Sequence, residues 1–129
     1  MFLENVEKLR EYAATFARGL APGACVALHG DLGAGKTEFA RAVIRALRGE
    51  GAVVPSPTFT IAQEYGGISH FDLYRVKGAE ELLEIGLPDA LGRDIVLIEW
   101  PEIAWDILPG NTIHVYLEAK GRGREITVK

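Results

Sequence analysis

Apolar residues recur along this chain with two periods, which separate the helical segments from the strands. A spacing of three and four residues predicts a helix over residues 3–20, on the stripe Leu3, Val6, Leu9, Ala13, Phe16, Ala17 and Leu20. A second helix should end at Gly49, on the stripe Phe39, Ala40, Val43, Ile44 and Leu47. Shorter helical patterns cover residues 79–85 and 88–91.

The strand patterns differ in how apolar residues are arranged. Residues 25–28 and 95–98 are continuous apolar runs, which are typical of buried strands in a parallel sheet. Residues 59–65 and 68–74 flank Gly66-Gly67 and predict a hairpin, as do the alternating segments 113–117 and 125–128. Together these patterns predict an α/β, three-layer fold with a mainly parallel central sheet plus antiparallel hairpins.

Length and composition limit what the chain can be. At 129 residues and 48% hydrophobic content, residues 1–129 fit one domain. The net charge of −4 gives no general attraction to nucleic acid or to an anionic membrane. No apolar run approaches the roughly 20 residues of a membrane span, and the N-terminus does not resemble a signal peptide, so we expect a cytoplasmic protein. Cys25 is the only cysteine and should be an inert core thiol, while the scattered histidines argue against a transition-metal site.

One motif carries specific chemistry. Gly30-Asp-Leu-Gly-Ala-Gly-Lys-Thr37 matches G-x-x-x-x-G-K-[ST] between a predicted strand and a predicted helix. Its glycines let backbone N–H groups face a phosphate, Lys36 would reach the β- and γ-phosphates, and the Thr37 hydroxyl would hold Mg²⁺. The whole motif should therefore bind a triphosphate, through Asp31, Leu32, Gly33, Ala34, Gly35, Lys36 and Thr37. The alternative is an ordinary glycine-rich turn before a helix.

Two carboxylates are candidates for the remaining chemistry. Glu99 follows the buried strand 95–98, where phosphate-loop proteins place a second Mg²⁺ ligand. Asp72 shares one face of its strand with His70 and Tyr74, away from Phe71, and could orient the attacking water. A purely structural role for Asp72 would be an ion pair with Arg75.

Two further residues are expected near the γ-phosphate. Thr58, in a proline-stiffened loop over residues 53–58, could sense the γ-phosphate and Mg²⁺, or its hydroxyl could merely close the loop. Trp100 is singled out by its position beside Glu99, although a tryptophan more often serves packing. No N-K-x-D guanine signature is present, which favours ATP over GTP.

Four segments, in order, are similar to a known family. Gly30-Asp-Leu-Gly-Ala-Gly-Lys-Thr37, Ser56-Pro-Thr-Phe59, His70-Phe-Asp-Leu-Tyr-Arg75 and Ile98-Glu-Trp-Pro-Glu102 resemble the bacterial TsaE (YjeE) ATPases over nearly the whole chain. The resemblance implies a small P-loop NTPase-like fold and ATP hydrolysis in threonylcarbamoyl modification of adenosine 37 of tRNA. It also implies TsaD and TsaB as partners, with hydrolysis permitting repeated turnover and with tRNA held mainly through those partners.

The resemblance assigns residues as well. It places the Mg²⁺ ligands on Thr37 and Glu99, functional roles on Asp72 and Trp100, and a nucleotide contact on Arg124. Glu38 is a departure, because relatives often carry a second threonine there.

Two other functions fit the phosphate loop alone. One is a small-molecule kinase, although residues 75–93 are mainly acidic and aliphatic and do not resemble an arginine-bearing lid. The other is a non-catalytic binding module in which ATP orders the loop over residues 56–60 for a partner. Transfer of the γ-phosphate to water distinguishes an ATPase from both alternatives. A kinase would transfer it to a metabolite, and a non-catalytic module would not transfer it.

Overall fold

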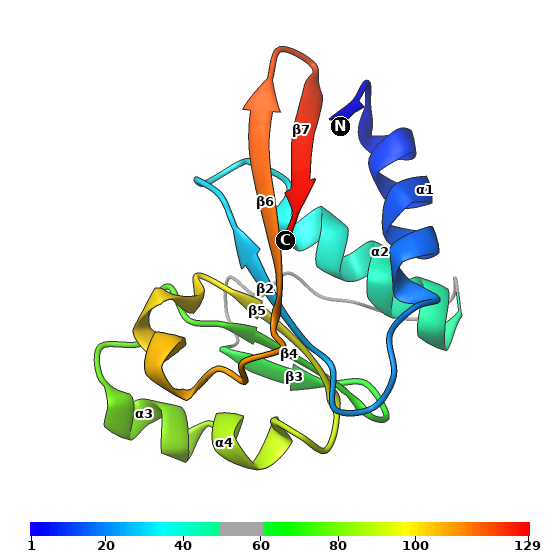
Figure 1. Cartoon of the computed structure of the whole chain (residues 1–129). Helices are drawn as coiled ribbons and strands as arrows, with labels where there is room; N and C mark the ends of the chain where they lie inside the picture. Colours follow the sequence, from blue (N-terminus) through cyan, green and yellow to red (C-terminus); the bar gives the residue numbers. More distant parts are fainter. Residues whose placement is uncertain (50–60) are drawn as a thin grey trace.

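The structure, a computed structural model, describes residues 1–49 and 61–129. Thr58 and the predicted loop over residues 53–58 lie outside these described residues. Within the described ranges one sheet contains the strands β1 (Phe2–Leu3), β2 (Cys25–His29), β3 (Ala62–Glu64), β4 (Ile68–Asp72), β5 (Ile95–Glu99), β6 (Ile113–Lys120) and β7 (Gly123–Val128). Their order across the sheet is β1-β7-β6-β2-β5-β4-β3 (Figure 1).

The centre of the sheet is parallel and its margins are antiparallel. β2 lies between β5 and β6 and is parallel to both, and β4 is parallel to β5. β3 pairs antiparallel with β4 at one edge, while β6, β7 and β1 pair antiparallel in succession at the other. The predicted mainly parallel sheet with antiparallel hairpins is confirmed. Because β2, β4 and β5 run in one direction, their carboxyl ends meet at one edge.

Helices cover both faces of the sheet and complete three layers (Figure 1). One face packs against α1 (Val6–Ala17) and α2 (Lys36–Arg48). The other packs against α3 (Ala79–Glu84), α4 (Leu87–Ala90) and a short 3₁₀ helix, η1 (Pro101–Ile107). Among the described residues, no helix combines the length and apolar character needed to cross a bilayer.

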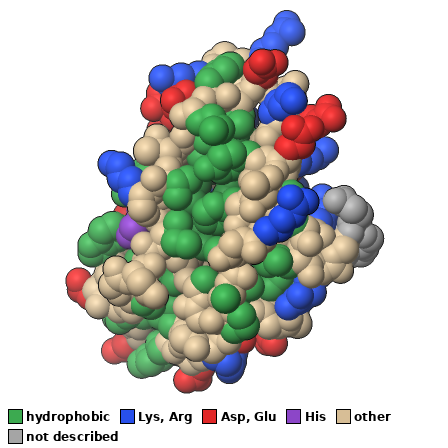
Figure 2. Space-filling model, turned by 45° about the vertical axis from the view of Figure 1, so that its right-hand side comes forward, with side chains coloured by type: hydrophobic (Ala, Val, Ile, Leu, Met, Phe, Trp, Pro, Cys, Tyr) green, Lys and Arg blue, Asp and Glu red, His purple; other side chains and the backbone are tan. Residues whose placement is uncertain are grey.

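Both faces of the central strands are buried, as their continuous apolar sequences predict. In β2, Leu28 joins the core under α1 and α2, whereas Cys25 joins the core under α3 and α4. In β5, Leu97 joins the core under α1 and α2, and Ile98 joins the core under α3 and α4. Burying each such aliphatic side chain contributes roughly 1.5–3 kcal/mol. Other apolar side chains reach the surface, and Figure 2 shows a band of them bordered by charged groups.

The chain start differs from the sequence-based prediction. Helix α1 begins at Val6, not Leu3, because the Asn5 side chain caps it by accepting a hydrogen bond from the Lys8 N–H at 2.9 Å. Phe2 and Leu3 instead form β1, paired with β7. An apolar stripe cannot reveal this boundary, because a strand residue and a helix residue can bury equally well against one core.

The phosphate-loop motif begins where the sheet leaves no room for a side chain. Gly30 follows β2 with a φ of 150°. A Cβ atom there would lie 2.5 Å from the Leu117 carbonyl oxygen of β6 and 2.9 Å from the Ala34 Cβ. The loop can therefore leave the end of β2 and enter α2 only with glycine at this position.

We expect Gly30→Ala to lower the free energy of unfolding by about 2 kcal/mol, because the added methyl group meets backbone that cannot easily move. Gly110→Ala is the matched control, since a Cβ at Gly110 has no neighbour within 4 Å and its φ is not in the left-handed region. Urea unfolding of both variants measures the difference. Equal stability of the two variants would show that the loop relaxes freely.

Candidate active site

The loop between β2 and α2 has the backbone shape of an anion cradle. Gly33 and Gly35 have φ angles of 81° and 106°, in the left-handed region. Gly35 caps α2 and has no side chain that could bond the first N–H groups of that helix. These N–H groups and the positive end of the helix dipole favour a phosphate.

Lys36 lies inside the loop rather than in solvent. Its side chain is only 4% exposed, and its Nζ donates a hydrogen bond to the Gly30 carbonyl oxygen. The same Nζ lies 3.2 Å from the centroid of the Trp100 ring, a cation–π contact. Burial lowers the pKa of Lys36, and the nearby carboxylates, Glu99 and Asp72 first, oppose this effect.

Glu99 connects three elements of the fold. It ends β5 and is buried. Thr37, in the first turn of α2, donates from Oγ1 to Glu99 Oε1 at 2.9 Å. His70 Nε2 lies 2.8 Å from Glu99 Oε2. The structure thus places the two predicted Mg²⁺ ligands in direct contact.

The donor set suits one kind of metal. The described residues contain no group of three or more His, Cys, Asp or Glu side chains that could hold an ion without help. Mg²⁺ is ordinarily held by one or two protein oxygen ligands together with substrate phosphates. The hydroxyl of Thr37 and the carboxylate of Glu99, beside an anion cradle, fit this pattern.

Asp72 lies beside Glu99 at the end of β4, because the two residues are register partners in parallel strands. Its Oδ1 accepts a hydrogen bond from the Tyr74 N–H at 3.0 Å. Burial raises the pKa of Asp72 and the Glu99 charge adds to this, against the effects of the Tyr74 N–H, His70 and Lys36. Within the described parts of the chain Asp72 forms no ion pair with Arg75, so the structural alternative for Asp72 has no support here.

Arg124 reaches the loop from β7, a strand remote in sequence. Its Nη1 donates to the Gly123 carbonyl oxygen at 2.9 Å. Its Nε is buried and lacks a hydrogen-bond partner among the described residues. A Cβ on Gly35 would lie only 3.4 Å from that Nε. A buried guanidinium nitrogen without a partner beside an anion cradle fits a phosphate ligand.

These groups surround one cavity of about 330 Å³. The side chains and backbone that line it are Leu32, Gly33, Gly35, Lys36, Thr37, Glu38, Asp72, Glu99, Trp100 and Arg124. Trp100 has a φ of 56°, the only non-glycine positive φ among the described residues. Such backbone conformations cost about 1–3 kcal/mol and persist at functional sites.

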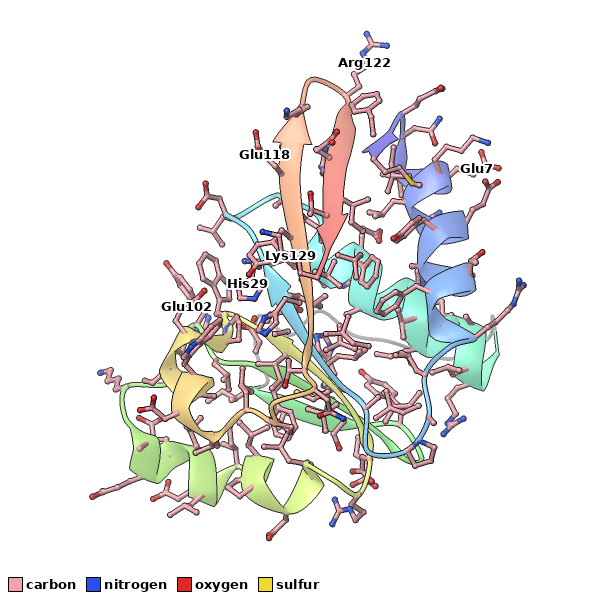
Figure 3. The ribbon with its side chains drawn as sticks, in the orientation of Figure 1. Glu7, His29, Glu102, Glu118, Arg122 and Lys129 are labelled. Atoms are coloured by element: carbon pink, nitrogen blue, oxygen red, sulfur yellow. The ribbon has the colours of Figure 1, made fainter. Side chains whose placement is uncertain are left out.

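Not every predicted site residue lines this cavity. Ala34 is buried in the core, so only its backbone can serve a ligand. Asp31 lines a neighbouring cavity of about 400 Å³ together with His29 and Glu102, and Figure 3 shows how the last two lie. Glu38, the departure from the family pattern, pairs with Arg10 of α1 at 3.4 Å.

Two histidine arrangements were not foreseen from the sequence. His70 contacts Glu99, and His29 Nε2 lies 2.9 Å from His114 Nδ1, with its ring stacked on Tyr116. Both arrangements arise from strand pairing, because β2 lies beside β6 and β4 beside β5. The spacing of histidines along the chain carries no signal of such pairing.

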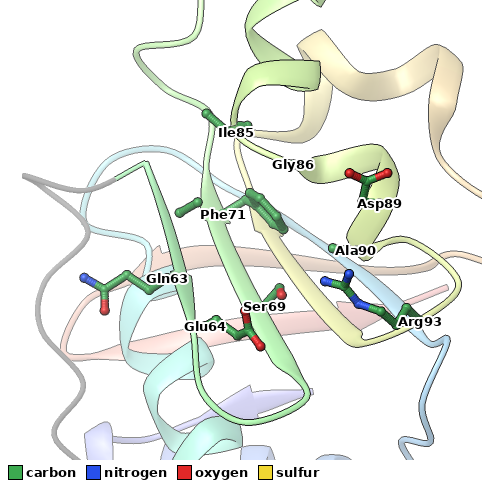
Figure 4. A pocket seen from close by; sticks show the side chains of 10 residues that line it. Gln63, Glu64, Ser69, Phe71, Ile85, Gly86, Asp89, Ala90 and Arg93 are labelled. Atoms are coloured by element: carbon green, nitrogen blue, oxygen red, sulfur yellow. The ribbon is translucent and has the colours of Figure 1, made fainter.

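A separate pocket of about 290 Å³ lies between β3, β4 and the helices α3 and α4 (Figure 4). Ser69 and Arg93 line it, and both bond the buried Asp94: Ser69 Oγ at 2.8 Å and Arg93 Nη2 at 3.0 Å. None of the predicted site residues that the structure describes lines this pocket.

Comparison with known proteins decides the family. Residues 3–126 match the model described as "Threonylcarbamoyl adenosine biosynthesis protein TsaE". This chain belongs to the TsaE family. Relatives named tRNA threonylcarbamoyladenosine biosynthesis protein TsaE include one from Rickettsia felis, 40% identical over 98% of this chain and 76% of that protein. Another, from Bacillus subtilis, is 35% identical over 96% of this chain and 78% of that protein.

Solved structures agree with the family. The crystal structure of Bacillus subtilis YdiB superposes with a TM-score of 0.78 and 30% identity, over 99% of this chain and 82% of that chain. The three-layer architecture is therefore the P-loop NTPase fold of the TsaE family, as the sequence resemblance implied.

We expect Arg124→Gln to weaken nucleotide binding about tenfold, because a charge-assisted hydrogen bond contributes roughly 1.5–3 kcal/mol. Arg122→Gln is the matched control, because this exposed arginine lies at the tip of the β6–β7 turn (Figure 3). Isothermal titration with ADP compares the two variants. Equal affinities would remove Arg124 from the nucleotide site.

Proposed function

We propose that this chain is a Mg²⁺-dependent ATPase that serves the threonylcarbamoyl modification of tRNA adenosine 37. One observation carries the proposal: a single cavity brings the phosphate loop together with Glu99, Asp72 and Arg124. The names of the matching TsaE relatives supply the process, tRNA threonylcarbamoyladenosine biosynthesis.

The loop and its cations would bind the triphosphate. The N–H groups around Gly33 and Gly35 face the β-phosphate, and Lys36 exchanges the Gly30 carbonyl and the Trp100 ring for β- and γ-phosphate oxygens. Arg124 supplies its unpartnered Nε to the same phosphates.

The carboxylates would prepare hydrolysis. Thr37 and Glu99 would hold Mg²⁺, which, when bound, neutralises charge on the β- and γ-phosphates. Asp72 would orient a water in line with the γ-phosphate and accept its proton. Burial raises the pKa of Asp72, which favours proton acceptance by this carboxylate.

The proposal extends to partners and location. TsaD and TsaB, the partners implied by the family, would carry the tRNA, because a chain of net charge −4 has no general attraction for it. Hydrolysis would permit repeated turnover of that assembly in the cytoplasm. Thr58, which lies outside the described residues, remains a candidate sensor of the γ-phosphate.

The kinase alternative gains nothing from the structure. Leu82 of α3 and Leu87 of α4 are buried in the core on the sheet face opposite α2. These helices therefore serve packing and do not line the cavity at the phosphate loop.

We expect Asp72→Asn to lower the rate of ATP hydrolysis at least about a hundredfold while ATP affinity stays within about threefold, because the amide cannot accept the proton of water. Asp106→Asn, a change at an exposed carboxylate on η1, should leave both quantities unchanged. The rate of phosphate release measures hydrolysis, and calorimetry measures ATP affinity. Loss of affinity equal to the loss of rate would contradict the assigned role and favour a binding module.

Lys36→Ala should stop modification of tRNA after about one turnover in a reconstitution with TsaD and TsaB, since the γ-phosphate loses its cation. Lys120→Ala, at an exposed lysine that ends β6 and does not line the cavity, is the control for loss of a positive charge. The measured quantity is modified tRNA per assembly. Many turnovers with Lys36→Ala would rule out a role for ATP hydrolysis in the cycle.

A further inference from the structure

We propose that His70 is the positioning residue of the metal site: its hydrogen bond to Glu99 holds the carboxylate in the orientation that binds Mg²⁺ with nucleotide. This inference rests on the proposed function, because it assigns a supporting role at the same site. His70 acts through Glu99 and is not itself a metal ligand.

The contact between the two side chains is short and enclosed. His70 Nε2 lies 2.8 Å from Glu99 Oε2, and the side chains of His70 and Glu99 are only 2% and 3% exposed. A carboxylate that binds Mg²⁺ is ionised and can only accept hydrogen bonds, so with the proposed metal bound His70 Nε2 would be the donor. Water has almost no access to replace this donor.

Strand register fixes where the imidazole lies. In the parallel pair β4–β5, His70 is opposite Leu97 and Asp72 is opposite Glu99. His70 is therefore the diagonal neighbour of Glu99 on the same face of the sheet, within reach of a long side chain. Backbone pairing on both strands holds this arrangement independently of any ligand.

The two oxygens of Glu99 have separate tasks. Oε2 is occupied by His70, and Oε1 is the oxygen that meets the Thr37 hydroxyl at the cavity. Without the His70 donor, the carboxylate could rotate and no longer present Oε1 beside Thr37. Partners that orient a ligating carboxylate in this way typically change metal affinity 10–100-fold when removed.

The test measures how much Mg²⁺ strengthens ADP binding, rather than activity alone. ADP affinity is determined by calorimetry with Mg²⁺ and again with EDTA, for the wild type, His70→Leu, His70→Gln and His70→Asn. Leu lacks a donor, Gln places an amide N–H₂ near the Nε2 position, and Asn is too short to reach Glu99. His114→Leu is the matched control, because that imidazole bonds His29 and not Glu99.

We expect His70→Leu and His70→Asn to weaken Mg²⁺–ADP binding at least about tenfold, with ADP binding in EDTA unchanged within about twofold. His70→Gln should retain Mg²⁺–ADP affinity within about threefold, and His114→Leu should behave as the wild type. If His70→Leu does not fold, the comparison of Gln with Asn decides, since both side chains are polar amides.

Three results would overturn the inference. Unchanged Mg²⁺–ADP affinity in His70→Asn would show that Glu99 needs no such donor. An equal loss of ADP affinity with Mg²⁺ and with EDTA in the His70 variants would show that His70 serves packing. A wild type whose ADP affinity does not depend on Mg²⁺ would overturn the proposed metal site as well, so the two failures are distinguishable.

Discussion

The buried carboxylate of Glu99 constrains the rest of the site. A charged group removed from water is costly unless hydrogen bonds and opposite charge compensate it, so its neighbours must be polar and fixed. Thr37 of α2 and His70 of β4 meet this need at 2.9 and 2.8 Å. One side chain thus connects α2 to the two parallel strands β4 and β5.

Two cationic side chains line the same cavity as Glu99, Lys36 from α2 and Arg124 from β7. Lys36 bonds the Gly30 carbonyl and covers the Trp100 ring, while Arg124 keeps a buried nitrogen without a partner among the described residues. Polar groups in such states have energy to gain from phosphate oxygens. The left-handed backbone at Trp100 adds strain beside them. Under the proposed function, phosphate oxygens would meet these groups where charge changes during phosphoryl transfer.

The sequence predicted where helices and strands lie better than it predicted which strands pair. Periodicity placed the helix after Thr37 and the strand before Glu99, and the glycines of the phosphate-loop motif predicted a backbone that turns N–H groups toward a phosphate. The contact of His70 with Glu99 was not foreseen, because it depends on β4 lying beside β5 in one register. Strand β1 was missed for the same reason, because Leu3 is a strand residue only through its pairing with β7. Local patterns specify burial, whereas the partner of each strand is set by the whole chain.

The central claim is that Thr37 and Glu99 hold Mg²⁺ at an ATP-hydrolysing centre. The most direct measurement is the Mg²⁺ dependence of ATP hydrolysis by Glu99→Gln beside the wild type, with TsaD and TsaB present. The amide keeps the size of the side chain but loses its charge, so half-saturation should move to at least about tenfold higher Mg²⁺. An unchanged Mg²⁺ dependence and rate in Glu99→Gln would contradict the claim.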